Sequence, residues 1–563
     1  MLKIKLLVVN LVAIGLLLTN LIDANATDNP AGTTLTSTLT GTSPLTNEGT
    51  ITLSGYGINN GTDGATIINS GTISVTGANN HGIASWASLS NITNSGLISV
   101  SGSGAIGIII WDNNNGGIIT NTQSGVISVS GWCGIALSND NSTLNNYGLI
   151  TGNSGIIAFN NSSTVNNFGR ILGTSGSAIY FQGINNTLNL LKGSVIVGNI
   201  YGNTGSKLNI NLGSGASYAY SVTGSWTVTD LDNRPMVTGS GTAYSAGIGA
   251  QETASEMLYQ RTAAITKSLD SRLYAYAADE ANVQPYWLDV YYADISRDAG
   301  ANYSTRTKFS NDTYGMTVGY KLPVEVTPLE LIVNAERSNL NIDSGNQKVD
   351  STSVMAGLLA PNLTQIAGAQ LSAKALLGYT NHEGDRKVMT NSLLYDGSRN
   401  IAADYDSYYA VVGANLLKLI PVNDHLTASV LAGLDLNTQH IESYAESDYF
   451  AWNSRTLTQF QSRIQAGLDY QFNDDKAKLF ARVGLERRDL VSGETQHYSI
   501  NDVGTITNVS FNTSNSNDTY LTGQVGVKAQ LERRIQLFGA LSGMRSSDTI
   551  STIQGNIGLR ADF

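Results

Sequence analysis

Short apolar runs alternate with glycine and asparagine through the first part of the chain. The pattern apolar-x-Asn-x-Gly-x-Ile occurs in six versions, whose glycines recur every 21 to 29 residues, at Gly49, Gly71, Gly96, Gly125, Gly148 and Gly169. A second apolar motif falls between them, in HGIASW, IGIIIW, CGIALS and SGIIAF. Alternation in runs such as Thr72–Val75 places every second side chain on one face. Each repeat therefore has an apolar stripe that only stacking on its neighbours can bury.

This repeat predicts an all-β fold for residues 27–197, a right-handed parallel β-helix. Asn and Gly are expected at its corners because both tolerate left-handed backbone conformations. A flexible, disordered tract is the alternative, but disorder does not require Ile and Val at matched positions. From residue 198 the repeat fades into extended segments, so residues 198–249 are expected to form a β-rich cap or junction.

A long helix is predicted over residues 250–282, which contain neither Gly nor Pro and are rich in Ala, Leu, Glu and Gln. About 30 residues of helix span roughly 45 Å, more than the thickness of a bilayer core. The segment carries several charged residues, so it cannot face lipid, but it suits the inside of a polar pore. An ordinary interdomain helix is the alternative.

Residues 283–563 change to segments of about 10 to 14 residues with strict alternation of apolar and polar positions. Twelve such segments begin near Tyr286, Thr313, Leu329, Val349, Gln370, Tyr405, Leu426, Thr456, Ala477, Thr519, Ile535 and Ser551. Long connections, expected outside at 303–311, 381–404, 438–454 and 490–518, alternate with short turns at 321–328, 472–476 and 532–534. This favours a twelve-stranded antiparallel transmembrane barrel over a soluble β-sandwich.

The first 26 residues are typical of a secretory signal peptide. Lys3 and Lys5 precede an apolar run over residues 6–18, and the small residues before Ala26 predict cleavage between Ala26 and Thr27. A membrane anchor would need about 20 apolar residues, and this run is shorter.

Composition removes several classes of protein. The net charge is −11 and Lys and Arg are not clustered, which argues against a nucleic-acid partner. Only 11 of residues 27–245 are charged, against 61 of residues 246–563, so a domain boundary is expected near residue 245. Cys133 is the single cysteine, so neither a disulfide framework nor a Cys-based zinc site is expected, and the thiol is expected to be buried.

The order of these segments resembles that of monomeric type Va autotransporters of Gram-negative bacteria. The similarity rests on the repeat region, the helix, the twelve barrel segments, and the motifs Tyr286-Trp287-Leu288, Tyr314-Gly315, Gly319-Tyr320 and Gly558–Phe563. It implies an outer-membrane barrel in contact with lipid and a passenger exported to the cell surface. It also implies that periplasmic chaperones and the barrel-assembly machinery act on the chain. The assembly signal would be Ile557, Leu559, Ala561 and Phe563, and the helix around Ser255 to Ala278 would thread the pore.

One departure from that family concerns release of the passenger. Some members cut themselves inside the pore helix beside an Asn pair, and this helix has no Asn before Asn282. We therefore expect the passenger to stay attached to the barrel, in a monomer. A trimeric adhesin would take four strands from each chain, and twelve strands in one chain argue against it.

No catalytic, cofactor or metal site is expected in the passenger. The run Gly173–Ser177 is similar to the GDSGS motif of some passenger proteases, but Thr174 replaces the Asp, and His81 with Asp112 or Asp140 would have to complete a triad from separate repeats. The acids Asp63, Asp112 and Asp140 are scattered, unlike the clusters of β-helix lyases. We expect no enzyme.

The aromatic residues of the repeats suggest a different role. Trp86, Trp111 and Trp132 follow the second motif at nearly the repeat spacing, with Tyr147 and Phe159 nearby. On the surface they could stack on sugars or anchor a host or cell–cell ligand, whereas inside they would be core. The sequence thus favours a displayed adhesive or structural protein. A porin-like channel with an accessory N-terminal domain is the alternative function.

Overall fold

The computed structural model describes residues 27–111, 116–213, 215–239, 241–279, 283–298, 307–324, 327–342, 346–447, 449–472, 476–502, 505–513, 517–532, 534–547 and 549–562. They form two compact units, residues up to 245 with 388–399, and residues 246–387 with 400–563. The predicted signal peptide lies outside the described residues.

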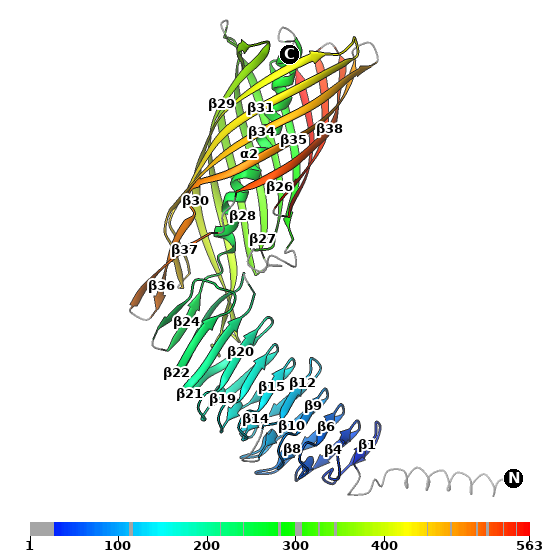
Figure 1. Ribbon diagram of the computed structural model, residues 1–563, viewed down its shortest axis with the longest axis vertical. Coiled ribbons are helices and arrows are strands. Elements are labelled where there is room, and N and C mark those ends of the chain that lie inside the picture. Colours follow the sequence, from blue (N-terminus) through cyan, green and yellow to red (C-terminus); the bar gives the residue numbers. More distant parts are fainter. Residues whose placement is uncertain are drawn as a thin grey trace, which may run out of the picture. The chain divides into compact units, whose positions relative to one another are not determined.

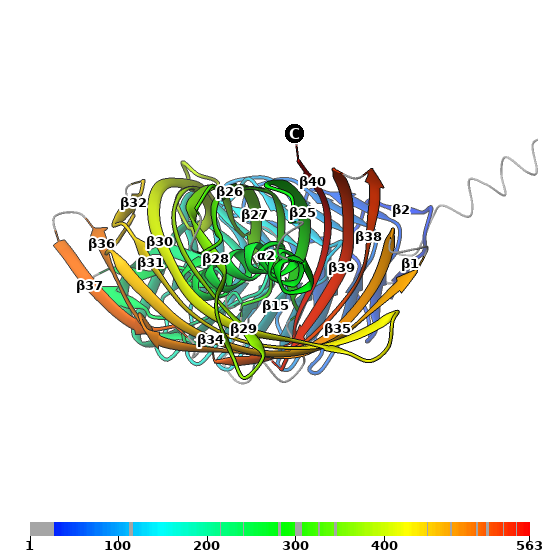
Figure 2. The same cartoon turned by 90° about the horizontal axis from the view of Figure 1, so that it is seen from above.

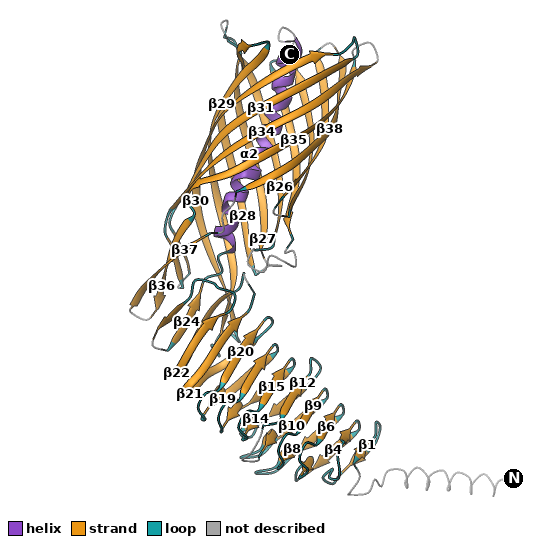
Figure 3. Ribbon diagram, in the orientation of Figure 1, coloured by secondary structure: helices purple, strands orange, loops and turns teal. Residues whose placement is uncertain are grey.

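Three parallel sheets build the first unit into a solenoid of about eight turns (Figures 1 and 3). One sheet contains β1 (Asp28–Asn29), β3 (Leu45–Asn47), β6 (Thr66–Asn69), β9 (Asn91–Asn94), β12 (Ile118–Asn121), β15 (Thr143–Asn146), β18 (Thr164–Asn167) and β20 (Thr187–Leu191). The next contains β2 (Thr34–Leu35), β4 (Thr50–Leu53), β7 (Thr72–Val75), β10 (Leu97–Val100), β13 (Val126–Val129) and β16 (Leu149–Gly152). The third contains β5 (Ile58–Asn60), β8 (His81–Ser85), β11 (Ile106–Ile110), β14 (Cys133–Leu137) and β17 (Ser154–Ala158).

Equivalent repeat positions lie one above another. Ile67, Ile92 and Ile119 are aligned by the pairing of β6, β9 and β12, and all three are almost fully buried in one continuous apolar core. No single turn could bury these side chains alone, so the stacking itself makes the core. The predicted parallel β-helix is confirmed.

The repeated Asn residues end the strands of the first sheet, at the short turn into the second sheet, so they lie at corners as expected, but their backbone is not left-handed. Asn69 donates from Nδ2 to Asn94 Oδ1 at 2.7 Å, and Asn94 donates in the same way to Asn121 at 2.8 Å. The series, which we call the Asn ladder, comprises Asn29, Asn47, Asn69, Asn94, Asn121, Asn146 and Asn167, all with side chains essentially inaccessible to solvent. These amides point inward because each finds a partner in the next turn, which satisfies a buried polar group. Other asparagines, among them Asn79 and Asn141, adopt the left-handed conformation.

The repeated glycines are required by the close approach of neighbouring turns. A Cβ on Gly96 would lie 2.0 Å from the carbonyl oxygen of Gly71, and one on Gly148 would lie 2.2 Å from that of Gly125. No side chain fits at such a distance. The glycines therefore recur at the repeat spacing because neighbouring turns touch at these positions. Their backbone is not left-handed.

Longer strands complete the first unit. β19 (Arg170–Phe181), β21 (Val195–Asn211) and β22 (Ser217–Asp230) each pair with more than one neighbour, and β23 (Val237–Gly239) and β24 (Thr242–Ser245) add antiparallel strands. Buried Asp230 accepts hydrogen bonds from Tyr218 Oη at 2.8 Å and from Arg234 Nε at 2.9 Å. These contacts close the end of the apolar core with satisfied polar groups.

Twelve antiparallel strands form the barrel among the described residues, which confirms the predicted number. They are β25 (Tyr286–Arg297), β26 (Phe309–Leu322), β27 (Leu329–Ile342), β28 (Gln347–Ile366), β29 (Ala369–Thr390), β30 (Ser398–Pro421), β31 (Leu426–Ile441), β34 (Arg455–Phe472), β35 (Ala477–Ser492), β38 (Asp518–Glu532), β39 (Ile535–Ser546) and β40 (Ile550–Ala561). The first and last strands pair, with Val290 opposite Ile557. The barrel thus has no open edge.

The barrel wall is apolar outside and polar inside. On β26, Tyr314 is exposed outward, whereas Thr313 and Thr317 are buried. Pairs of tyrosine rings, Tyr292 with Tyr314 among them, lie on the outer wall with centroids 5.0 Å apart. Aromatic pairs on an apolar outer band are typical of barrels in outer membranes.

Two of the predicted outer connections contain strands of their own. β32 (Tyr444–Glu446), β33 (Phe450–Trp452), β36 (Thr495–Asp502) and β37 (Thr505–Asn512) form a four-stranded sheet. The predicted connection at 381–404 is short, because β29 and β30 extend into it. Period-two alternation continues in β29 and β30 beyond the apolar band, so the apolar pattern alone underestimated the length of these strands.

Candidate functional site

The predicted helix is α2 (Gly249–Asp279), and it lies in the barrel lumen (Figure 2). Its charged side chains are enclosed: Glu256 is 1% exposed and Arg272 is fully buried. Leu258, Ile265 and Leu269 join an apolar cluster with residues of the wall. No helix among the described residues is long and apolar enough to cross a membrane.

Ion pairs fasten the helix to the wall along its length. Arg261 Nε lies 3.1 Å from Glu336 Oε1, and Arg463 Nη1 lies 2.7 Å from Asp270 Oδ2. Further along the helix, Arg272 pairs with Glu330. Burying charges is costly unless each is paired and hydrogen-bonded, so removal of one partner would leave the other uncompensated. The pairs therefore fix both the depth and the rotation of the helix.

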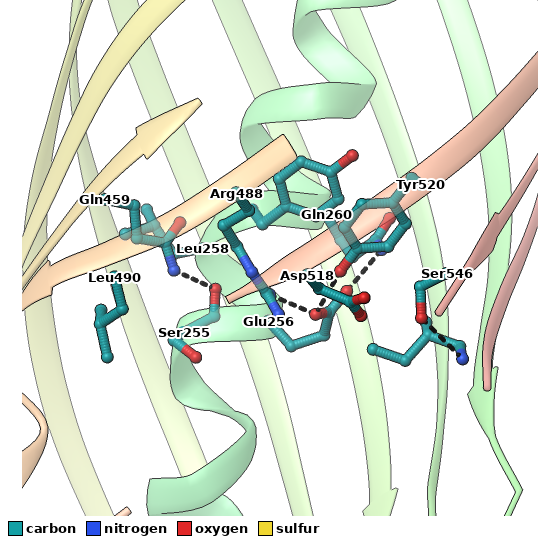
Figure 4. A network of polar contacts seen from close by, with 12 residues as sticks. Ser255, Glu256, Leu258, Gln260, Gln459, Arg488, Leu490, Asp518, Tyr520 and Ser546 are labelled. Atoms are coloured by element: carbon teal, nitrogen blue, oxygen red, sulfur yellow. Dashed lines mark hydrogen bonds and ion pairs between the residues drawn. The ribbon is translucent and has the colours of Figure 1, made fainter. Parts of the chain in front are cut away.

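Glu256 is the centre of one such network (Figure 4). Its carboxylate pairs with Arg488, and accepts hydrogen bonds from Tyr520 Oη at 2.9 Å and from Gln260 Nε2 at 2.6 Å. Tyr520 in turn stacks on Tyr259 of the helix with ring centroids 4.6 Å apart. Charged and aromatic contacts together hold this turn of the helix against the barrel wall.

One cavity lies between the helix and the barrel wall, and it is very small. That cavity, lined by Ala263, Lys267, Asp435 and Arg463, has a volume of about 10 Å³. This is about the volume needed for a single water centre. The geometry is that of a filled lumen, so it does not favour the porin-like alternative.

The start of the helix is held by the four-stranded sheet of β32, β33, β36 and β37 and by the beginning of β34. Gln251 donates from Nε2 to Tyr444 Oη at 2.8 Å, and Arg455 Nη1 donates to the backbone oxygen of Gln251 at 2.8 Å. The tilted rings of Trp452 and Tyr498 contact each other with centroids 4.9 Å apart, and Trp452 also contacts Tyr444. The segment that enters the lumen is thus enclosed by the connections between barrel strands.

A second candidate site lies on the solenoid, where the three predicted tryptophans are exposed. Trp86, Trp111 and Trp132 are 39%, 51% and 41% exposed. Trp86 and Trp111 contact each other at 5.8 Å between centroids, and Trp132 contacts Phe159 at 5.6 Å. We call the whole row the aromatic strip, and it comprises Tyr56, His81, Trp86, Trp111, Trp132, Phe159, Tyr180 and Tyr201.

The strip covers the outer side of the third sheet. Beneath the rings lies an apolar layer separate from the core, and it includes Ile106, Ile109, Cys133 and two alanines, Ala84 and Ala136. Burial raises the pKa of the Cys133 thiol, which keeps it protonated and unreactive. This buried position agrees with the expectation for a lone thiol.

The other predicted residues fall in several places. Ile557 and Leu559 are 73% and 37% exposed on the outer wall, whereas Ala561 is buried. Ala26 and Phe563 lie outside the described residues, and Thr27, beside the expected cleavage point, is described.

The protease-like motif is not assembled into a triad by any contact found here. Ser177 is part of β19 and pairs with Asn199, whereas His81 stacks on Tyr56 with centroids 5.3 Å apart. Asp112 lies outside the described residues. No group of three or more His, Cys, Asp or Glu side chains suited to a metal ion occurs among the residues that the structure describes.

Sequence reasoning missed the wall partners of the helix and half of the aromatic strip. The missed partners are charged residues at inward-facing positions of strands with alternating apolar and polar residues, namely Glu330, Glu336 and Arg463. Their inward direction could have been predicted from that alternation. Tyr180 and Tyr201, stacked at 4.8 Å, continue the strip where the repeat spacing becomes irregular.

Comparisons with known proteins concern the C-terminal part of the chain. The autotransporter beta-domain family matches residues 286–542. The translocator domain of the autotransporter NalP from Neisseria meningitidis is 20% identical, with coverage of 54% of this chain and 98% of that chain and a TM-score of 0.39. The transport unit of the autotransporter AIDA-I from Escherichia coli is 10% identical, with coverage of 51% and 92% and a TM-score of 0.33. The beta domain of the Bordetella autotransporter BrkA is 11% identical, with coverage of 50% and 100% and a TM-score of 0.35.

No curated protein matches the chain. The family match runs from the first barrel strand, β25, into β39, and the β-solenoid precedes it in the sequence. The C-terminal part of this chain is an autotransporter β-domain, an outer-membrane translocator barrel that exports the N-terminal β-solenoid to the cell surface as its passenger.

Proposed function

We propose that the passenger is an adhesive rod that stays attached to its barrel and meets its ligand through Trp86, Trp111 and Trp132. The observation that carries this proposal is the exposure of the three indole rings in one strip. Large exposed aromatic groups on a soluble surface are typical of binding sites, because they offer much contact area at little cost in conformational entropy. No enzymatic activity and no cofactor form part of the proposal.

Continued attachment is supported by two features of the helix. It contains no Asn before residue 282, and its buried ion pairs fix it within the lumen. Surface extracts of cells that express the chain are expected to contain one full-length species. Separate fragments of passenger and barrel size would contradict attachment.

The barrel also indicates the partners of the protein. The exposed outer wall suits lipid, and β40, with Ile557 and Leu559 on that wall, suits recognition by the barrel-assembly machinery with the help of periplasmic chaperones. We propose a monomer, since one chain closes the barrel by itself. The ligand of the passenger belongs to a host surface or to another cell.

Adhesion is tested with intact cells that display the chain. Replacement of Trp86, Trp111 and Trp132 together by Ala is expected to lower attachment to host cells and cell–cell clumping by about fivefold or more. Tyr147 and Phe168 provide the matched control, because they form a separate exposed pair with centroids 4.6 Å apart. Equal attachment by the triple variant and the parent, at equal surface display, would contradict the adhesive role.

A further inference from the structure

The aromatic strip has a shape and a chemistry that select one kind of ligand. It runs over successive strands of the third sheet, β5, β8, β11, β14 and β17, and continues onto β19 and β21. At about 4.8 Å per turn, these seven levels extend over about 29 Å. The strip is therefore long, and its rings come from both ends of the strands: Trp86 and Trp111 follow β8 and β11, whereas Trp132 precedes β14. A linear ligand along the solenoid axis can contact rings at several levels.

The strip includes exposed rings on the outer side of a sheet. Ala84 and Ala136 are buried in the apolar layer against which Tyr56, Phe159 and Tyr180 pack. Protein partners are usually anchored by side chains that fill pockets in the centre of an interface. Exposed ring faces, such as those of Trp86 and Trp111, which are tilted by 39° to each other, instead suit a partner that is itself flat and apolar on one face. A sugar ring has such a face, made of its C–H groups.

Charge is absent from the five short strands beneath the first part of the strip. β5, β8, β11, β14 and β17 contain no Asp, Glu, Lys or Arg. A sulfated or uronic-acid polymer would need cationic partners, because charge-assisted hydrogen bonds supply most of the recognition of such groups. The strip therefore favours a neutral ligand.

Amide side chains accompany the rings. Asn59 accepts a hydrogen bond from Trp86 Nε1 at 2.7 Å, and Asn199 donates from Nδ2 to Thr223 Oγ1 at 3.0 Å beside Tyr201. An amide carries two donor hydrogens and two acceptor lone pairs, so each of these has capacity beyond the bond described. Amides suit hydroxyl groups, which also donate and accept.

We propose that the aromatic strip binds a neutral linear polysaccharide, with sugar rings stacked on Trp86, Trp111 and Trp132 and hydroxyl groups hydrogen-bonded to the flanking amides. This inference rests on the proposed adhesive function and names its ligand class. The bound polysaccharide lies along the solenoid axis, so successive sugars contact successive turns. Affinity then grows with the number of sugars, since each added ring meets another aromatic group.

The test uses the purified full-length chain in detergent, mixed with insoluble polysaccharides. The neutral probes are cellulose, chitin and a β-1,3-glucan, and the charged probes are immobilised heparin and polygalacturonate. We expect retention on at least one neutral probe and release by its soluble oligosaccharides, with longer ones more effective. Trp111→Ala is expected to lower the retained fraction about fivefold or more, and Trp111→Tyr to restore most of it.

Tyr147→Ala is the matched control, since Tyr147 is 44% exposed but lies outside the strip. Protease resistance of each purified variant reports whether its solenoid is folded. Retention on no neutral probe, retention on charged probes alone, or undiminished retention of folded Trp111→Ala would each overturn the inference. If the triple tryptophan variant still loses cell attachment in that case, the adhesive role stands without the glycan. If attachment is unchanged, the adhesive role itself is wrong.

Discussion

The solenoid and the barrel use the same alternation of side chains with opposite results. In the solenoid, Ile92 and Ile119 point inward to an apolar core, and the exposed positions of the same strands are largely polar. In the barrel, Leu377 and Ile557 point outward and are 70% and 73% exposed, and the buried positions are largely polar or charged. The alternation therefore defines two faces, and the surroundings decide which of them is buried.

The width of each interior explains the difference. The solenoid has room only for side chains that meet across it, and its buried polar groups are paired with near neighbours, above all in the Asn ladder, which is paired from turn to turn. The barrel is wide enough for a whole helix, and the helix supplies partners for charges such as Glu336 and Arg463. Buried polarity is repetitive and local in one unit and specific and long-range in the other.

The largest expected effect comes from crowding the lumen. Ala264 is 4% exposed, and Ala264→Arg would force an unpaired charge and a long side chain against the wall. We expect surface display of the passenger to fall about tenfold or more, measured by protease digestion of intact cells. Ala278→Arg, at an exposed position of the same helix, is the control. Unchanged display of Ala264→Arg would argue against a helix held in the lumen.

Loss of one partner of a charge pair should be nearly as severe for the barrel. Glu256→Ala would leave Arg488 buried without its carboxylate. We expect a destabilisation of about 3 to 5 kcal/mol, seen as a lower temperature at which the folded barrel band unfolds in gel electrophoresis. The double variant Glu256→Ala with Arg488→Ala should recover part of the loss, whereas Glu383→Ala, exposed on the outer wall, should change little. Equal melting of Glu256→Ala and the parent would refute the role of this network.

The spacing of the turns gives a prediction confined to the solenoid. Gly96→Ala introduces a Cβ that would collide with the backbone of the preceding turn, whereas a Cβ on Gly61 would have no neighbour within 4 Å. We expect Gly96→Ala to cost about 1 to 3 kcal/mol of passenger stability, and Gly61→Ala almost nothing. Urea-dependent protease sensitivity of the passenger provides the measurement. Similar sensitivity of the two variants would contradict the role of close approach.

Breaking the Asn ladder should have a comparable or smaller effect. Asn94→Ala removes one amide from the series and leaves the groups of Asn69 and Asn121 short of a partner, at a cost of about 1 to 3 kcal/mol. Asn91→Ala, on the exposed side of the same strand, is the control. Comparable urea midpoints for the two variants would show that the ladder contributes little.

The smallest effect concerns pH. Burial lowers the pKa of His81 below its ordinary value of 6.5, so the unfolded chain binds more protons in the window below 6.5. Stability from this group is therefore fully present above that value and is lost as the pH falls below it. From about pH 7.5 to about pH 5 we expect the Tm of the passenger to fall about 2 °C further in the parent than in His81→Phe. Identical pH dependence of the two proteins would exclude this contribution.

Much of the fold was accessible from local patterns. The twelve barrel strands begin near the predicted residues, and the helix predicted over 250–282 runs from Gly249 to Asp279. These predictions succeeded because alternation, strand length and the absence of Gly and Pro act within a single segment. The outer strands β36 and β37 were expected as a long connection, because their short apolar face, with Tyr498, Ile500 and Val509, is buried only through pairing with β33.

The candidate sites were less accessible. The spacing of Trp86, Trp111 and Trp132 indicated an alignment but not a direction. Their exposure on the outer side of the solenoid became known only from the structure. The repeated Asn lie at corners as expected, but the reason given for it was wrong: their backbone is not left-handed, and a side chain one turn away offers each of them a buried partner.

The sequence alone determined the solenoid, the helix and the barrel, because each is encoded in a period that repeats along neighbouring residues. Only the tertiary structure decided where the Asn amides, the tryptophans and the lumen charges point. Those directions depend on groups distant in sequence: Asn94 meets Asn121 and Arg261 meets Glu336 only once turns have stacked and strands have closed around the helix.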